Sequence, residues 1–206
     1  LGGITRLTES GLSITEWKPL LGAIPPLTMQ DWHEAFAKYQ QIPEFKIQNS
    51  AMTLDEFKSI YWWEWAHRFL GRIIGVAFLL PLVVFTISGR IGRALWPRLA
   101  LLFVLGGLQG ALGWFMVASG LVDRVDVSQY RLAAHLSLAV AVFAAIVWTA
   151  LGLSMARPAT YGRAPRLALL VLAGLFLQIA AGGFVAGLDA GFASSTWPKM
   201  DGAWIP

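Results

Sequence analysis

Cysteine is absent from this chain, and charged residues are scarce. None of the 206 residues is a cysteine, which excludes disulfides, iron–sulfur clusters, thiolate metal sites and cysteine nucleophiles. Asp, Glu, Lys and Arg together make up only 14% of the chain, whereas a soluble domain carries roughly 25%. The net charge of +4 is small, and the basic residues lie beside apolar segments. We therefore interpret the charge as a signal of membrane topology and not of nucleic-acid binding.

Long apolar segments dominate what is present. The chain is 56% hydrophobic, and its mean hydropathy is +0.59. A span needs about 20 apolar residues to cross roughly 30 Å of hydrocarbon, and backbone groups in lipid must be satisfied within the chain, so spans of this kind are helices. The sequence predicts an all-α membrane protein, with membrane lipids around four spans at about Phe69–Ser88, Leu99–Ala118, Leu132–Leu153 and Leu167–Leu188.

The connecting segments predict the orientation of these spans. Two short connections carry basic residues and no acid, and such loops stay in the cytoplasm; they contain Arg90, Arg93 and Arg98, and then Arg157, Arg163 and Arg166. Acidic residues outnumber basic ones between Thr5 and Tyr61, and the connection at residues 123–126 is mixed. Both are therefore expected on the outer side. The first and third spans then run in the same direction, from outside to inside.

The long outer region is expected to contain short helices. Residues 31–41 could form one of them. Thr53 and Glu56 have the spacing of a capping box, with a hydroxyl at the N-cap and a carboxylate at N3. A helix that starts there can continue directly into the first span, with Trp62 and Trp63 at the outer interface.

An internal repeat links the two ends of the chain. Residues 1–26 align without gaps to residues 181–206, with seven of 26 positions identical. Each half would begin with a span that ends in two glycines, and most of the second half would lie beyond Pro206. The expected divisions are 1–4, the tail of a truncated span; 5–66, an outer loop with short helices; 67–155, the spans that carry His67 and His135; 156–188, the fourth full span and start of the second repeat; and 189–206, the truncated outer loop of that repeat.

Two of the three histidines lie at equivalent depths. His67 begins the first full span and His135 begins the third, so both are expected near the outer face. One histidine from each of two bundle helices is the arrangement that holds a six-coordinate haem iron. The alternative is an interfacial histidine bonded to a neighbour. Zinc is disfavoured because the sequence has no HExxH motif and no cysteine. His33 lies in the polar outer region, and we assign it no role.

Charged residues surround this histidine level. Glu64 precedes His67 by three residues, so the two share one side of a helix, and a carboxylate there could serve acid–base chemistry. Alternatively, Glu64 is an ordinary interfacial residue paired with Arg68 or Lys58. Arginine binds carboxylates bidentately, so three arginines are candidates for the haem propionates, with plain interfacial anchoring as the alternative: Arg68, Arg72 and Arg131.

Four blocks of the sequence resemble the haem A synthase family, in its proteobacterial and mitochondrial branch. They are GGITRLTESGLSITEWKPLLGAIPP, YWWEWAHRFLGR, YRLAAHLSLA and GGFVAGLDAGFASSTWPKMDGAWIP. The resemblance implies eight spans in two similar four-helix halves, each with a histidine pair. His67 and His135 would be the ligand pair of the N-terminal half, with Glu64 as the essential carboxylate. The other pair, with haem B, would lie past Pro206. Some bacterial members carry a cysteine pair in outer loops, which this chain lacks.

The same resemblance implies an activity and a location. The family oxidises a ring methyl of haem O to the formyl group of haem A, which cytochrome c oxidase needs. Haem O synthase and cytochrome c oxidase assembly factors are then candidate partners, homo-oligomers are left open, and the location is the bacterial inner membrane, or the mitochondrial inner membrane in a eukaryote. One alternative is a di-haem b-type electron-transfer protein, which has no need for Glu64. Another is a non-catalytic membrane assembly or transport protein with structural histidines.

Overall fold

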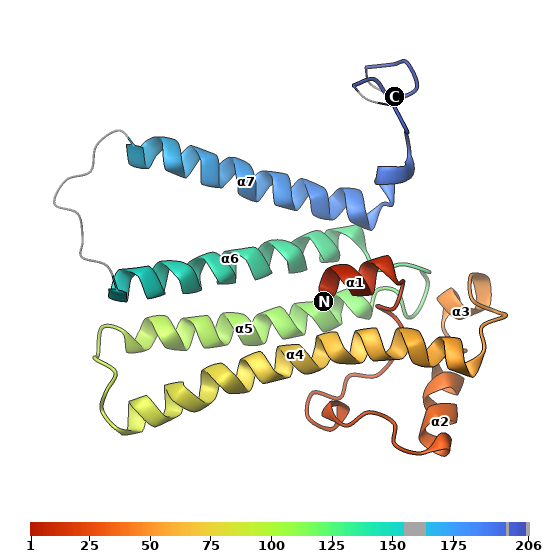
Figure 1. The fold of residues 1–206 in the computed structure, drawn as a ribbon, viewed down its shortest axis with the longest axis horizontal. Coiled ribbons are helices and arrows are strands. Elements are labelled where there is room, and N and C mark those ends of the chain that lie inside the picture. The colour runs from red at the N-terminus through yellow and green to blue at the C-terminus, as the bar shows by residue number, and fades with distance from the viewer. Residues whose placement is uncertain (155–163, 197, 205–206) are drawn as a thin grey trace. The chain divides into compact units, whose positions relative to one another are not determined.

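The computed structural model describes residues 1–154, 164–196 and 198–204, and within them it is helical with no strand. Seven α-helices and two short 3-10 helices are described: α1 (Gly2–Leu7), η1 (Leu21–Ala23), α2 (Met29–Tyr39), α3 (Pro43–Ile47), α4 (Leu54–Ile87), α5 (Trp96–Val117), α6 (Gln129–Ser154), α7 (Ala164–Gly187) and η2 (Ala190–Phe192) (Figure 1). The chain divides into two compact units, Leu1–Val127 and Ser128–Pro206, and each is described by itself.

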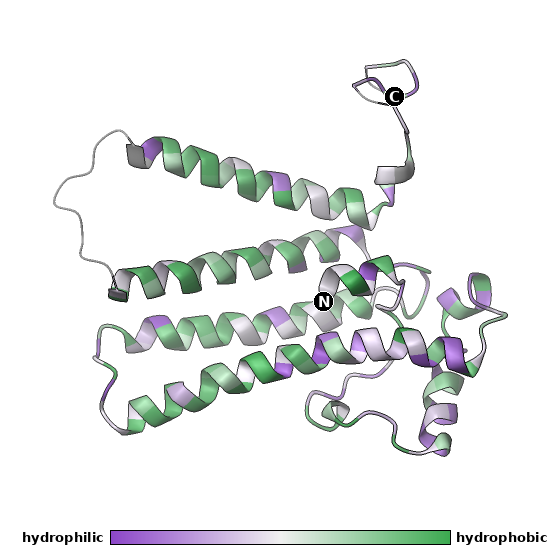
Figure 2. Cartoon of the chain, in the orientation of Figure 1, coloured by the Kyte–Doolittle hydropathy of each residue, from purple (hydrophilic) through white to green (hydrophobic). Residues whose placement is uncertain are grey.

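Four helices are long and apolar enough to cross a membrane: α4, α5, α6 and α7 from Arg166 onward. This confirms the expectation of an all-α membrane protein with four spans. Figure 2 shows the apolar stretches of these helices and the more polar outer region of the first unit. Side chains such as Ile74, Leu80 and Ile87 are exposed along α4, as lipid-facing residues of a span would be. Arg157 and Arg163, which predicted an inner loop, lie outside the described residues.

Helix α4 carries the outer region and the first span on one axis. Its N-terminus has the expected capping box: the Glu56 amide donates to Thr53 Oγ1 at 3.4 Å, and the Thr53 amide donates to Glu56 Oε2 at 2.7 Å. The helix then continues without a break for 34 residues. The division expected between residues 66 and 67 therefore falls inside a continuous helix.

A small core holds the outer region against α4. Tyr39 and Phe57 are fully buried, and they cluster with Trp32, Ile42 and Tyr61 among others. Helix α2 begins two residues earlier than the expected 31–41, because the Thr28 side chain caps it and accepts from the Asp31 amide at 3.1 Å. The outer region is therefore a packed structure and not a loose loop.

In the second unit, α6 and α7 pack closely through glycine. A Cβ placed on Gly183 would lie 2.9 Å from Ala133 Cα, and one on Gly187 would lie 2.7 Å from Gln129 Cα. Any larger side chain at either position would force the two backbones apart, so these small residues permit the close approach.

The two ends of the repeat share local backbone geometry at an offset of 180 residues. Helix α1 ends at Leu7 and α7 ends at Gly187, and the equivalent residues Glu9 and Asp189 both have a φ of 50°. Equivalent amide hydrogen bonds also follow: Ser13 to the Ser10 carbonyl at 3.2 Å, and Ala193 to the Ala190 carbonyl at 3.1 Å. This match supports the repeat, although its Trp197 and Pro206 lie outside the described residues.

Candidate functional site

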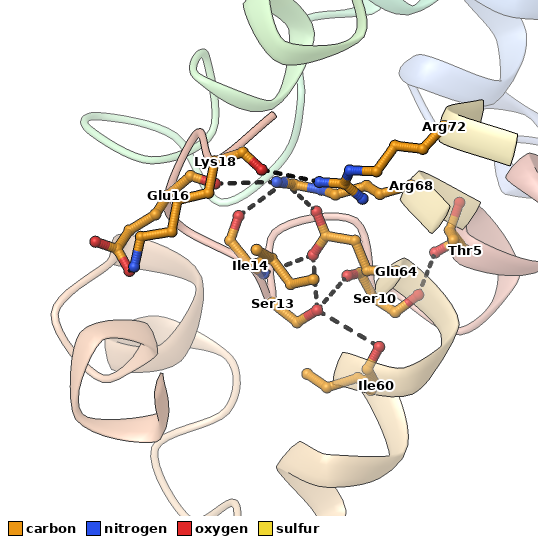
Figure 3. Close-up of polar contacts among 10 residues, drawn as sticks. All are labelled: Thr5, Ser10, Ser13, Ile14, Glu16, Lys18, Ile60, Glu64, Arg68 and Arg72. Atoms are coloured by element: carbon orange, nitrogen blue, oxygen red, sulfur yellow. Dashed lines mark hydrogen bonds and ion pairs between the residues drawn. The ribbon is translucent and has the colours of Figure 1, made fainter. Parts of the chain in front are cut away.

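The Glu64 carboxylate is the centre of a buried polar cluster in the first unit. It is only 3% exposed. Its Oε2 accepts hydrogen bonds from Ser13 Oγ at 2.7 Å and from the Ile14 amide at 2.6 Å, and its Oε1 accepts from Arg68 Nη2 (Figure 3). A carboxylate buried inside the protein needs such donors, since burying it without partners is very costly. The outer segment at residues 13–14 supplies two of the three.

Arg68 ties the same carboxylate to the outer segment. Its Nη2 also donates to the Ile14 carbonyl at 2.8 Å, and its Nη1 donates to the Glu16 carbonyl at 3.1 Å. Its guanidinium lies 5.6 Å from the centre of the Trp114 ring on α5, close enough for a cation–π contact. The Arg68 guanidinium therefore donates hydrogen bonds from both of its Nη atoms and contacts the Trp114 ring through one face.

Glu64 does pair with Arg68, as the alternative reading of the sequence allowed. Lys58, the other candidate partner, instead bonds Asp55 at 2.8 Å. The Glu64–Arg68 pair differs from an ordinary interfacial pair because the carboxylate is buried and two further donors bind it. Breaking a buried pair of this kind is far more costly than breaking an exposed one.

Arg72 lies one helical turn beyond Arg68 and keeps one donor unused. Its Nε donates to the Pro19 carbonyl at 2.9 Å, and its Nη2 donates to the Lys18 carbonyl at 3.0 Å. Its Nη1 is buried and has no hydrogen-bond partner among the described residues. A buried donor without a partner is unusual in a folded protein and calls for an acceptor.

A cavity of about 410 Å³ lies beside these arginines, between the outer segment, α2 and α4. Its apolar wall includes Leu21, Ile24 and Leu27. Its charged lining residues are Glu16, Lys18, Asp31, Glu34, Lys38, Arg68 and Arg72. Glu16 bonds Lys38 at 2.7 Å and Lys18 at 3.0 Å, and these two cations lower the pKa of the Glu16 carboxyl.

His67 lies on α4, one turn after Glu64, and packs against α1. A Cβ added to Gly2 would lie 3.5 Å from both Cε1 and Nε2 of its imidazole. Such a Cβ would be in van der Waals contact with the ring, so the α1 backbone lies close to His67. The His67 imidazole and the Glu64 carboxylate are thus both contacted by the first 14 residues of the chain.

His135 and Arg131 lie on α6 in the second unit. Residues Gln129 and Ala133 face α7, and two further residues turn the helix by about 200°. Arg131 and His135 therefore share the side of α6 that points away from α7. Because His67 belongs to the first unit and His135 to the second, their meeting at one iron stays a prediction. His33 is exposed on α2.

Glu44 on α3 is a second buried carboxyl group that the sequence analysis did not identify. It is 3% exposed, and its Oε2 has no hydrogen-bond partner within the described part of the chain. Burial, with a smaller contribution from the negative charges of Glu64, Glu9 and Asp126, raises the pKa of the Glu44 carboxyl to about 8. The nearby Tyr39 hydroxyl accepts from Asn49 Nδ2 at 2.8 Å, and burial raises the Tyr39 pKa as well.

The sequence analysis also did not identify Ser13 and Ile14 as hydrogen-bond donors to Glu64. The only available signal was indirect: a carboxylate in an apolar helix requires donors, and the neighbouring outer segment is rich in hydroxyl groups. In the parts of the chain that the structure describes, no group of three or more His, Asp or Glu side chains could hold a metal ion directly.

Comparison with known proteins places this site in a family. A family model described as "Cytochrome oxidase assembly protein" matches residues 1–206. A protein named heme A synthase from Parvibaculum lavamentivorans is 58% identical over 100% of this chain and 60% of its own length. Proteins of the same name from Maricaulis maris and Mesorhizobium japonicum are each 56% identical over the whole chain, which covers 61% and 57% of them. The chain thus spans about three fifths of these relatives. No solved structure matches significantly.

Proposed function

Because the chain belongs to the cytochrome oxidase assembly protein family that its full-length match identifies, we propose that the protein it forms is a haem A synthase. The names of relatives that are 54–58% identical support this activity. The protein would be an oxidoreductase acting on a CH3 group, converting the ring methyl of haem O to the formyl of haem A. The observation that carries the proposal is the buried Glu64 carboxylate, which accepts three hydrogen bonds and lies one helical turn before His67.

His67 and His135 would each supply an imidazole to hold the haem substrate through its iron. The bound porphyrin would supply redox chemistry at its ring edge. The side chains of this chain would orient the ring, exclude water and move protons.

Glu64 is the group that can take a proton. Its carboxylate lies close in sequence to the ligand histidine, and its three donors fix its position. We propose that it accepts a proton from the ring methyl or from an attacking water. A base with a fixed position is effective because proton transfer depends on hydrogen-bond reach.

The arginines divide into two roles. Arg68 contacts Glu64, two backbone carbonyls and Trp114. We therefore propose that Arg68 positions Glu64, and not that it binds a haem propionate as expected from the sequence. Arg72 has the unused donor and is the better candidate for a haem propionate. Arg131, four residues before His135, keeps its proposed propionate role.

Partners and location follow from the proposed reaction. Haem O would be the substrate, so haem O synthase would supply it and cytochrome c oxidase assembly factors would receive haem A. Four spans place the protein in a membrane, and we propose the bacterial inner membrane, or its mitochondrial counterpart. Haem B would bind in the second half of the full-length protein, and homo-oligomers are compatible with this proposal.

Pigment analysis tests the function. The full-length protein would be produced together with haem O synthase in a host that makes no haem A, and its haems would be extracted and separated by chromatography. We expect haem A from the wild type and haem O without haem A from Glu64→Ala. Haem B alone in the wild type would instead identify a b-type electron-transfer protein, and a preparation without any haem absorbance would refute both functions.

A further inference from the structure

The Ser13 hydroxyl has more acceptors than it has protons. It is 2% exposed and lies 2.7 Å from Glu64 Oε2, 2.9 Å from the Ser10 carbonyl and 3.4 Å from the Ile60 carbonyl (Figure 3). A hydroxyl donates a single hydrogen but can also accept. At any moment Ser13 can therefore satisfy either the carboxylate or one of the carbonyls as a donor.

The other neighbours of the carboxylate can only donate. The Ile14 amide and the Arg68 guanidinium have hydrogens and no acceptor atoms, and both already point at Glu64. If Glu64 gains a proton, that proton needs an acceptor, and in the hydrogen-bonded shell of Glu64 only Ser13 can provide one.

We propose that Ser13 is a positioning residue that keeps the Glu64 carboxyl group in one place both with and without its proton. With Glu64 ionised, the Ser13 hydroxyl donates to Oε2. When Oε2 takes a proton, the new O–H donates to Ser13 Oγ, and the Ser13 hydrogen rotates to the Ser10 carbonyl 2.9 Å away. Glu64 gains one covalent O–H bond, and Ser13 keeps its own O–H bond, which only changes direction.

This exchange rests on the proposed function, because it matters only where Glu64 acts as a base. It allows a proton to arrive and leave while the carboxyl group stays where the reaction needs it. Without Ser13, a protonated Glu64 would face two donors and no acceptor. It would then have to rotate away or leave a buried O–H unsatisfied.

Charged and titratable neighbours of Glu64 do not compete for this role. Arg68 and Tyr61 lie on α4 itself, and Glu44 on α3 interacts with Glu64 through its charge. Burial raises the pKa of Glu44 to about 8, so at neutral pH that group stays protonated and adds no second charge. Glu16, on the outer segment, is engaged with Lys18 and Lys38.

The second copy of the repeat shows that the turn equivalent to residues 10–13 forms without the Ser13 hydroxyl. Ala193 is the equivalent of Ser13, and its amide bonds the Ala190 carbonyl at 3.1 Å, against 3.2 Å for Ser13 and the Ser10 carbonyl. Ser10 is likewise replaced by Ala190 in the second turn. The variants Ser13→Ala and Ser10→Ala should therefore both fold, and they make a matched pair of buried hydroxyl deletions.

Infrared spectroscopy tests the proposal directly. Spectra of the full-length protein, recorded without substrate, would be compared with those of Glu64→Gln to assign the Glu64 bands in the ionised and protonated states. We expect Ser13→Ala to shift the Glu64 band in both states, because one hydrogen bond is lost in each. Ser10→Ala retains the Ser10 carbonyl and should reproduce the wild-type Glu64 bands. Ser13→Thr keeps the hydroxyl and should also leave both bands in place.

Turnover provides the second readout. Ser13→Ala should lower the rate of haem A formation by roughly 10- to 100-fold, by analogy with the range for hydrogen-bond partners that orient metal ligands, with haem content and KM unchanged. Ser13→Thr should restore most of the rate. A band shift in the ionised state alone would reduce Ser13 to a static anchor and overturn the proposal, as would unshifted bands. Failure of the wild type to form haem A would refute the function, while the infrared result would stand independently.

Discussion

Glu44 makes the outer region sensitive to alkaline pH. Its pKa is about 8 in the folded protein against an ordinary value of 4.5, chiefly because burial disfavours the charged form. Between these two values the folded protein holds a proton that the unfolded chain releases. The sign of the effect follows: the stabilisation is fully present below about pH 4.5 and is lost as the pH rises through about 8.

The size of the effect follows from the same two values. The difference, 8 − 4.5, is 3.5 pKa units, and each unit corresponds to about 1.36 kcal/mol. Ionising Glu44 inside the fold therefore costs up to about 5 kcal/mol, a large fraction of the stability of a typical domain. Glu44→Gln has nearly the same shape but cannot ionise, so it should remove this cost. We expect the variant to match the wild type near pH 4.5 and to exceed its stability by several kcal/mol at pH 9.

Hydrogen exchange would measure this difference locally. Amides of α2, α3 and the start of α4 would be followed by mass spectrometry in detergent between pH 5 and 9, with correction for the pH dependence of intrinsic exchange. Glu34→Gln, which changes an exposed glutamate on α2, provides the control and should leave the pH profile unchanged. A Glu44→Gln advantage that stays constant with pH, or that grows toward acid, would refute this account of Glu44.

Two further predictions concern the segment that covers α4. Arg68→Gln should leave the Glu64 carboxylate buried without its cation and destabilise the outer segment by roughly 3 to 5 kcal/mol, which would be seen as faster amide exchange at residues 10–16; unchanged protection there would show that the Arg68–Glu64 pair does not stabilise this segment. Gly2→Val should crowd the His67 imidazole, because a Cβ alone would already be in van der Waals contact with the ring at 3.5 Å and the two further methyl groups add bulk, and it should weaken haem retention. Gly3→Val is its control, because a Cβ there meets no atom within 4 Å, and equal haem absorption spectra for the two variants would contradict a positioning role for Gly2.

Helix positions were largely predictable because each depends on nearby residues. The apolar runs located both ends of α5, α6 and α7, and the C-terminal end of α4, to within three residues, since lipid crossing requires length and hydropathy alone. The Thr53–Glu56 pattern also predicted the start of α4 correctly, because a capping box is a contact between residues three apart. The position of Glu64 one turn before His67 followed from the same helical periodicity.

The surroundings of Glu64 could not be predicted in this way. Ser13 bonds Glu64 across 51 residues of sequence, and no local pattern specifies such a contact. Glu44 lies in a short segment, Pro43–Ile47, whose charges resemble those of a surface helix, yet its side chain is buried. Both features depend on how the outer region packs, which residue spacing does not determine. The pairing of His67 with His135 depends on the placement of two separate units and stays a prediction.

The unbroken length of α4 has a mechanical consequence. At 1.5 Å per residue its 34 residues extend about 51 Å, roughly 20 Å more than the hydrocarbon core of a bilayer. The packed outer region therefore rests on the same stiff rod that bears Glu64 and His67. A protein that binds to the packed outer region would therefore tilt or rotate Glu64 and His67 together, without contacting either residue.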